Sequence, residues 1–333
     1  MVDREELELI LKKFPWKGKI VNLREDGILQ DLIIKDGVVG CIINVSEDNS
    51  DFIKGIDSAL QEEISKIKNV SSVNVVFTSL KESDAIKAKL SVPGVKKVIL
   101  VSSGKGGVGK STIAFWLALA LKKQGLKVGL LDADIYGPSL PTMTSYYHKP
   151  EMVGDKMIPH DFRGVSVNSI GYLIPEEKAL VWRGPMLIKA LHQLIVNTNW
   201  GELDFLILDM PPGTGDIHLT LCEKYKIDGV LIVSTPHELA TADVSRVVDM
   251  YKKFSLPILG IIKNMSYVEI GGEKKYIFGA GEVLSSYSSR AEIPIIEEIS
   301  IDQNMSSFSA KDFAVPETIK NIAKEILFLV WNS

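Results

Sequence analysis

The 333-residue sequence has little cysteine and little excess charge. Its two cysteines, Cys41 and Cys222, are too far apart for a CxxC metal motif and too few for a disulfide framework. A reducing compartment is therefore expected, and we predict a cytoplasmic protein. The formal net charge of −4 disfavours bulk electrostatic binding to nucleic acid, so no nucleic-acid partner is expected.

Long hydrophobic runs are also missing. The first six residues are mostly charged and lack the apolar core of a secretory signal. The longest apolar candidate, residues 113–121, is shorter than the roughly 20 residues that a spanning helix needs. The remaining composition, 46% hydrophobic and 24% charged, is that of a globular protein, and the length suits one large domain with a smaller one.

Residues 1–80 predict a small α+β domain without a catalytic constellation. Its apolar residues alternate between helical and strand periodicity. The expected elements are a helix capped by Asp3 with an apolar face extending to Phe14, strands over 28–34 and 38–45 joined by a tight turn at Asp36-Gly37, a helix capped by Asp51, and a strand over 73–77.

A second, larger domain is predicted over residues 95–333. Residues 81–94 mix charge with Ala and Ser and end in Pro-Gly, so we place a linker there. Beyond it, short Val/Ile/Leu runs alternate with helical patterns, which indicates an α/β domain with a doubly wound, mostly parallel sheet. The predicted strands are 98–101, 128–131, 205–208, 229–233 and 258–262.

A phosphate-binding motif, G-x-x-x-x-G-K-[ST], lies between the first of these strands and a helical pattern over residues 113–123. Backbone N–H groups of such a loop turn toward phosphates, Lys110 can reach the β and γ phosphates, and Ser111 can ligate Mg²⁺. The motif predicts a nucleotide site, and a chance glycine-rich turn is the alternative. Its residues are Gly104, Lys105, Gly106, Gly107, Val108, Gly109, Lys110, Ser111 and Thr112.

Two carboxylates, Asp132 and Asp134, follow the strand over 128–131. The carboxyl ends of parallel strands are where α/β folds bind their ligands, so both side chains can face Mg²⁺ or an attacking water. For either residue alone, a turn or a helix cap is the alternative.

Three more strand ends carry candidate residues. Asp209 follows four apolar residues, the Walker B arrangement in which a carboxylate holds Mg²⁺. Gly213, in the Pro-Pro-Gly that comes next, could donate its N–H to a γ-phosphate, with a purely structural turn as the alternative. Pro236 and Asn264 are expected to form a base pocket, since an Asn amide can match the edge of adenine.

The loop GKGGVGKST contains an extra lysine, Lys105, and in this form it resembles the deviant phosphate loop of the MinD/ParA-like ATPases. The resemblance implies that Lys105 reaches across a nucleotide-sandwich homodimer to the partner's phosphates, with a solvated loop-tip lysine as the alternative. It also implies that Asp134 positions or deprotonates the attacking water and that Asp132 supports it or the metal. Asn264 would read adenine, which makes ATP the nucleotide.

Longer motifs resemble the Mrp-type iron–sulfur cluster carriers of that group. The resemblance covers nearly the whole second domain and implies a homodimer that binds a cluster at its interface and passes it to apo-proteins under ATP control. The motifs are DADIYGPSLPT at 132–142, WRGP at 182–185, WGELDFLILDMPPGTGD at 200–216, NMSY at 264–267 and YIFG at 276–279.

Between NMSY and YIFG the sequence departs from that family. The family usually carries a CxxC pair there that ligates a bridging cluster, whereas residues 268–275 read VEIGGEKK. We expect Cys222 in a buried helix face, and Cys41 can equally belong to a core. The five histidines are scattered without ligand spacing. An iron–sulfur cluster is therefore a cofactor implied by resemblance, with its ligands unknown.

Other functions stay open. A MinD/ParA-like spatial organiser would bind a membrane or DNA, and the apolar helical face over residues 318–331 could lie on lipid. Packing on the sheet explains the same pattern, so we expect no membrane partner. An assembly adaptor without a cluster is the related alternative. A metabolic ligase or small-molecule kinase would need a substrate pocket that no motif marks.

Overall fold

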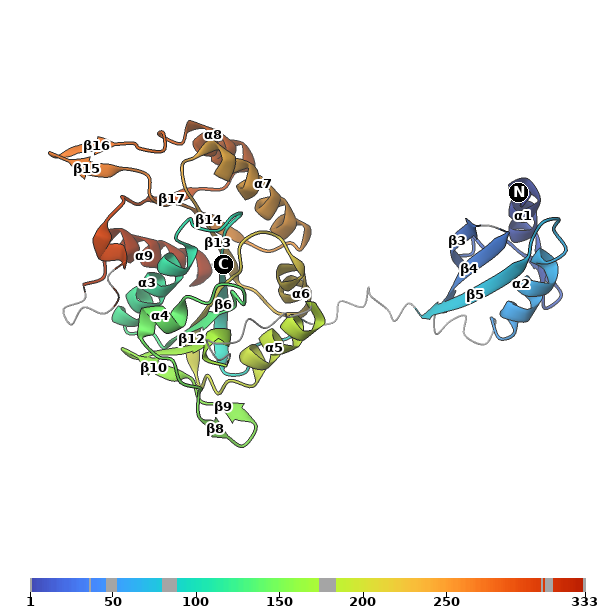
Figure 1. Cartoon of the computed structure of the whole chain (residues 1–333), viewed down its shortest axis with the longest axis horizontal. Coiled ribbons are helices and arrows are strands. Elements are labelled where there is room, and N and C mark those ends of the chain that lie inside the picture. The colour runs from blue at the N-terminus through green and yellow to red at the C-terminus, as the bar shows by residue number, and fades with distance from the viewer. Residues whose placement is uncertain are drawn as a thin grey trace. The chain divides into compact units, whose positions relative to one another are not determined.

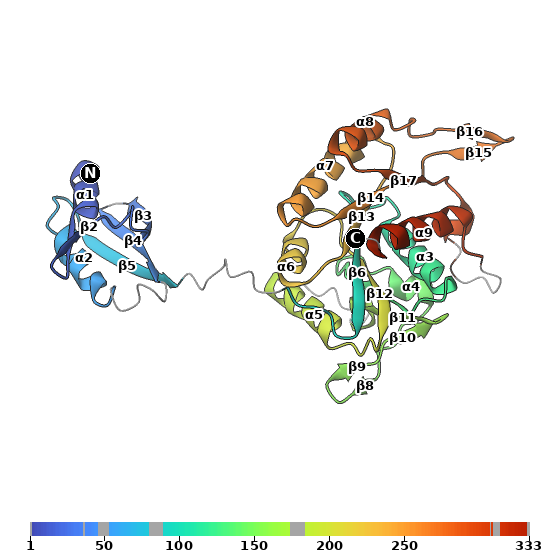
Figure 2. The same ribbon diagram turned by 180° about the vertical axis from the view of Figure 1, so that it is seen from behind.

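The computed structural model divides into two compact units, Met1–Ala88 and Lys89–Ser333. Figures 1 and 2 show their elements from opposite sides. The structure describes residues 2–35, 37–45, 53–79, 89–173, 184–306, 308 and 314–331.

The smaller unit is α+β. Its three-stranded sheet has the order β3-β4-β5, with β3 antiparallel and β5 parallel to the central β4. Leucines and isoleucines from both helices pack with the strands into one core. The elements are α1 (Arg4–Lys12), β1 (Phe14–Trp16), β2 (Lys19–Val21), β3 (Leu29–Lys35), β4 (Val38–Val45), α2 (Ile56–Ile64) and β5 (Ser72–Ser79).

The predicted start of α1 is confirmed, because the Asp3 carboxylate accepts from the backbone N–H groups of Glu5 and Glu6. The prediction that Phe14 lies on this helix is wrong, since the helix ends at Lys12 and Phe14 opens β1. The residue before a proline avoids helical geometry, and Phe14 precedes one.

The start of α2 also differs from the prediction. The helix begins at Ile56, with Gly55 at the N-cap position and no side-chain cap. The cap proposed at Asp51 and the turn residue Asp36 lie outside the described residues.

An eight-stranded sheet forms the centre of the larger unit, in the order β10-β11-β7-β12-β6-β13-β14-β17. The five predicted strands are present and parallel, and they are β6, β7, β12, β13 and β14. Only β10 at one edge is antiparallel among these eight described strands. The bounds are β6 (Val95–Ser102), β7 (Val128–Asp132), β10 (His160–Phe162), β11 (Val165–Ser169), β12 (Leu203–Asp209), β13 (Gly229–Ser234), β14 (Ile258–Lys263) and β17 (Ile295–Glu298).

Helices cover both faces of this sheet (Figure 1), which confirms the doubly wound α/β architecture. On one face lie α3 (Lys110–Lys123) and α9 (Glu317–Trp331). On the other lie α5 (Gly184–Val196), α6 (Asp216–Lys224), α7 (Glu238–Lys253) and α8 (Glu282–Ala291). Smaller elements are α4 (Leu140–Thr144), the 3₁₀ turns η1 (Ile170–Tyr172) and η2 (Gln303–Ser306), and the hairpins β8 (Met152–Val153) with β9 (Lys156–Met157) and β15 (Val268–Ile270) with β16 (Glu273–Lys275).

The C-terminal helix α9 belongs to the core. Its apolar face packs on α3 and the sheet, with Ile319, Ile322, Ile326 and Val330 at most 2% exposed. The helical face considered for lipid is thus largely covered by the protein itself. None of the helices in the described part of the chain has the length and hydrophobicity that a bilayer-spanning helix needs.

Candidate functional site

The phosphate loop connects β6 to α3. Gly109 occupies the N-cap position of α3 with a φ of +83°, a conformation that favours glycine. A side chain at this position would also collide with the amide of Asn264. That amide donates to the carbonyl oxygen of Val108 at 2.8 Å. Asn264 therefore supports the phosphate loop, a role that its sequence position did not reveal.

A cavity of about 290 Å³ forms where the phosphates are expected. Gly104 is absent from its lining, because this residue packs against the Asp243 backbone of α7, which leaves no room for a side chain. The loop residues that line the cavity are Ser103, Lys105, Gly106, Gly107, Val108, Gly109, Lys110, Ser111 and Thr112, joined by Asp134, Gly137, Ser139, Met143 and Pro212.

The predicted lysine and carboxylates meet beside this cavity. Lys110 Nζ lies 2.5 Å from Asp209 Oδ1, 3.4 Å from Ser111 Oγ and 3.9 Å from Asp134 Oδ2. Burial raises the pKa of Asp209 against the opposing effect of Lys110. Burial, and then the charge of Asp209, raise the pKa of Asp132 to about 7. Crowded carboxylates beside one ammonium are a donor set that fits Mg²⁺.

Asp132 holds the loop that carries Asp134. Its Oδ1 accepts from the Asp134 N–H at 3.1 Å, and its Oδ2 accepts from the N–H groups of Ser139 and Leu140 and from the Ser169 hydroxyl at 3.0–3.1 Å. These four donors match the turn-cap alternative for Asp132. Of the two carboxylates, Asp134 and not Asp132 lines the phosphate cavity.

The segment after Asp209 is held by the Met210 N–H, which donates to the carbonyl oxygen of Val101 at 3.0 Å, and by two further hydrogen bonds. The N–H of Gly213 donates to the carbonyl oxygen of Ser103 at 2.8 Å, so it would have to leave this partner to reach a γ-phosphate. His218, in the first turn of α6, lies 2.9 Å from the carbonyl oxygen of Pro211. No motif in the sequence pointed to His218, because a backbone carbonyl leaves no pattern of side chains and its other partner, Tyr251, lies 33 residues away. We call residues 210–215 the Gly213 loop.

The remaining predicted positions are also brought to the carboxyl edge of the sheet. Lys105 lines the phosphate cavity, and its carbonyl oxygen accepts from the Ser103 hydroxyl at 2.9 Å. Pro236 and Asn264 follow the adjacent strands β13 and β14, and both are buried. Neither lines the phosphate cavity. Trp182 and Arg183 of the WRGP motif lie outside the described residues.

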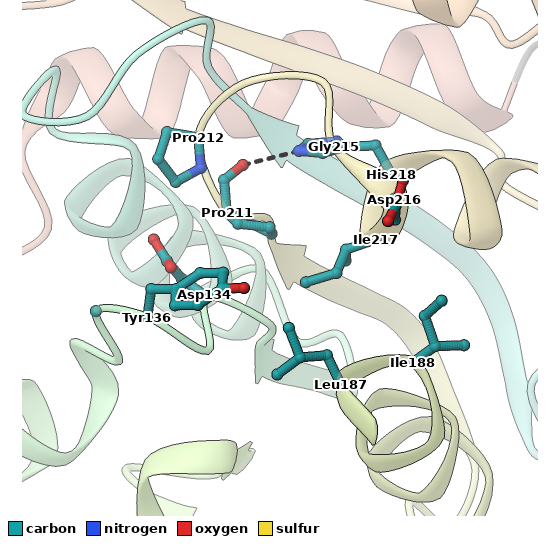
Figure 3. A pocket seen from close by; sticks show the side chains of 11 residues that line it. Asp134, Tyr136, Leu187, Ile188, Pro211, Pro212, Gly215, Asp216, Ile217 and His218 are labelled. Carbon is teal, nitrogen blue, oxygen red and sulfur yellow. Dashed lines mark hydrogen bonds between the residues drawn. The ribbon is translucent and has the colours of Figure 1, made fainter. Parts of the chain in front are cut away.

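A second cavity, of about 430 Å³, lies beside the first. Figure 3 shows Asp134 and Tyr136 near Leu187 and Ile188 of α5, with the Gly213 loop above them. Most of its lining is apolar. Three residues, Asp134, Gly137 and Pro212, line both cavities, so a change in either loop alters both.

Both cysteines belong to hydrophobic cores. Cys41 on β4 and Cys222 on α6 are each 0% exposed, which confirms the buried position expected for Cys222. Burial raises the pKa of Cys41 to about 11 and that of Cys222 to about 12, so both thiols are protonated at neutral pH. A thiol binds iron as the thiolate. Within the described ranges, no three His, Cys, Asp or Glu side chains are grouped as a metal site.

A phosphate loop between β6 and α3, a buried aspartate ending β12 and a parallel sheet covered on both faces define a P-loop ATPase of the MinD/ParA type. The chain belongs to the ParA family of NUBPL-type iron-transfer P-loop NTPases, whose sequence model matches residues 94–329.

Individual relatives agree with this family. The chain is 39% identical over 302 residues to the iron–sulfur cluster carrier protein of Rickettsia felis, covering 90% of this chain and 92% of that one. A nucleotide-binding protein from Archaeoglobus fulgidus, solved in complex with ADP, is 35% identical with a TM-score of 0.57, covering 68% of this chain and 95% of its own. The cell division ATPase MinD of Pyrococcus furiosus, 22% identical with a TM-score of 0.51, shares the fold over 70% of this chain and 99% of its own.

Proposed function

We propose that this protein is a cytoplasmic, ATP-dependent iron–sulfur cluster carrier or assembly factor that delivers clusters to apo-proteins. Family membership over residues 94–329 is the observation that carries the proposal, together with a relative named as a carrier that aligns over 90% of the chain. Hydrolysis of ATP is the activity that the family and the fold already give it.

The residues of the site take these roles in the proposal. Residues 104–109 cradle the phosphates with backbone N–H groups, and Lys110 binds them through its ammonium. Ser111, Asp134 and Asp209 hold Mg²⁺, which neutralises phosphate charge when bound. Pro236 and Asn264 border the adenine, while the Asn264 amide also holds the loop.

Hydrolysis requires a water and a cation near the γ-phosphate. Asp134 positions or deprotonates the water, and Asp132 fixes the loop on which Asp134 lies. Lys105 reaches the phosphates of a second copy in a homodimer. This assignment of Lys105 is supported by its place on the phosphate cavity, where no ion pair with a described residue occupies its ammonium.

A second candidate is an ATP-driven assembly adaptor that holds no cluster itself. The burial of Cys41 and Cys222 favours it, because neither protonated core thiol is available as a ligand. In both functions the cluster is cargo, and the candidates differ in whether this chain or another protein supplies the thiolates.

Anaerobic reconstitution separates the two candidates. The protein would be incubated with iron and sulfide, and bound iron, acid-labile sulfide and visible absorption would be quantified, with Cys41→Ala and Cys222→Ala as controls. Stoichiometric cluster that is lost with one cysteine supports the carrier. No cluster in a protein that hydrolyses ATP supports the adaptor.

Transfer then tests the proposal itself. The amount of cluster transferred to an apo-ferredoxin would be measured for the wild type with ATP and without ATP. The same measurement would be made for the Lys110→Ala variant, which lacks the phosphate-binding ammonium. ATP-dependent delivery that Lys110→Ala abolishes is the expected result. Delivery that neither ATP nor Lys110→Ala changes would contradict both candidates.

A further inference from the structure

His218 is buried, and both of its ring nitrogens have partners. Its Nε2 lies 2.9 Å from the Pro211 carbonyl oxygen, and its Nδ1 lies 2.8 Å from the Tyr251 hydroxyl on α7. A carbonyl oxygen only accepts, so Nε2 carries the proton, and in the neutral ring Nδ1 accepts from Tyr251. The side chain is 1% exposed, and Figure 3 shows the bond to Pro211 as a dashed line.

The hydrogen bond between His218 and Pro211 lies, along the chain, between the expected metal ligand and the contact with the phosphate loop. Pro211 lies two residues after the expected metal ligand Asp209 and two before Gly213, whose N–H contacts Ser103 of the phosphate loop. Pro212, the next residue, lines both cavities. The carbonyl of Pro211 is therefore the point at which the Gly213 loop is anchored on the side of α7.

We propose that His218 is a positioning residue for ATP hydrolysis, which donates from Nε2 to the Pro211 carbonyl and so fixes the Gly213 loop while residues after Pro211 respond to the γ-phosphate. Tyr251 selects the required tautomer by donating to Nδ1. The ring itself contacts neither nucleotide nor metal in this proposal, so it acts through the loop alone. The proposal concerns hydrolysis and does not depend on cluster delivery.

A matched pair of variants isolates the donor. In His218→Gln the side-chain amide can occupy the place of Nε2 and still donate to Pro211, whereas in His218→Asn the amide reaches only the place of Nδ1. Free energy equal to one net hydrogen bond, lost from the fixing of a loop in the transition state, lowers a rate by about tenfold. We expect His218→Asn to lower kcat for ATP by about that factor with little change in KM, and His218→Gln to keep most of the wild-type kcat.

The pair also separates positioning from packing, because both variants replace the ring with a smaller polar side chain. Folding would be checked by near-UV circular dichroism and by ADP affinity, which should match the wild type in both. Equal kcat values for the two variants, whether both high or both low, would overturn the proposal. Should His218→Asn fail to fold, Tyr251→Phe replaces it: a lower kcat at unchanged KM is expected, and a wild-type kcat would overturn the proposal.

Discussion

At the residue scale, the three carboxylates of this site have different partners, although each follows an apolar strand in the sequence. Asp132 accepts three hydrogen bonds from the loop that follows it and a fourth from Ser169 at the end of β11, while Asp209 pairs with Lys110, and Asp134 faces the phosphate cavity. A strand-end position predicted that all three would lie at the sheet edge. It could not predict their separate partners, because Ser169 lies 37 residues from Asp132 in the chain.

Asp132→Asn tests the loop-holding role. An amide nitrogen in place of either oxygen would face N–H donors, so we expect the free energy of unfolding to fall by about 1–3 kcal/mol, the range for a buried polar group without a partner. Chemical denaturation measures it. Ser169→Ala removes a single donor and should have a smaller effect. A fully stable Asp132→Asn protein without ATPase activity would instead indicate a direct catalytic role.

His218 gives the stability a pH dependence. Burial lowers its pKa from 6.5 to about 4, so between these values the unfolded chain binds a proton that the folded protein does not. The contribution of neutral His218 to the free energy of unfolding is fully present above pH 6.5. It is lost as the pH falls through 4, and the loss is about 3 kcal/mol in total.

Denaturation at pH 7 and pH 4.5 would measure this loss in the wild type and in His218→Gln. The raised pKa of Asp132 acts in the opposite direction over part of this range, so the readout is the difference between the two proteins. That difference should shrink on acidification. A constant difference would show that His218 does not titrate as its burial requires.

At the scale of elements, the sequence predicted the strands that are buried on both faces. Continuous apolar runs marked β6, β7, β12, β13 and β14. The flanking strands β11 and β17 were missed, because at least half of the residues in each are polar or charged and no apolar run of useful length remains. The missed strands widen the sheet, whereas the predicted ones carry nearly every candidate site residue.

The packing of α9 makes a prediction about the C-terminal helix. Ile322→Ala opens a cavity against α3 and should lower the free energy of unfolding by about 2–5 kcal/mol, as buried Ile→Ala changes do. Phe328→Ala, at a position that is 63% exposed, is the matched control and should change stability little. Flotation with anionic liposomes completes the test, because lipid binding that Phe328→Ala weakens would favour a spatial organiser.

At the scale of the whole molecule, the two units have separate cores. Every residue assigned to the nucleotide site belongs to Lys89–Ser333. The proposed division into a small domain over 1–80, a linker over 81–94 and an ATPase domain over 95–333 stays a prediction. Composition indicated the linker, but composition alone does not fix where one folded unit ends.

Removing the first 88 residues tests the independence of the ATPase unit. The shortened chain, residues 89–333, should fold and turn over ATP as the full chain does, because its core and its site are complete without the smaller unit. Circular dichroism and a phosphate-release assay measure this. Folding with strongly reduced turnover would assign the smaller unit a part in catalysis.

The ion pair between Lys110 and Asp209 links the two ligands of the site. The ammonium that neutralises Asp209 is the same one that is assigned to the phosphates. When a phosphate draws the Lys110 ammonium away, the buried carboxylate of Asp209 loses its counter-charge and can bind a divalent cation. Nucleotide and Mg²⁺ should therefore show heterotropic cooperativity, each raising the affinity of the other, and Mg²⁺ alone should bind weakly.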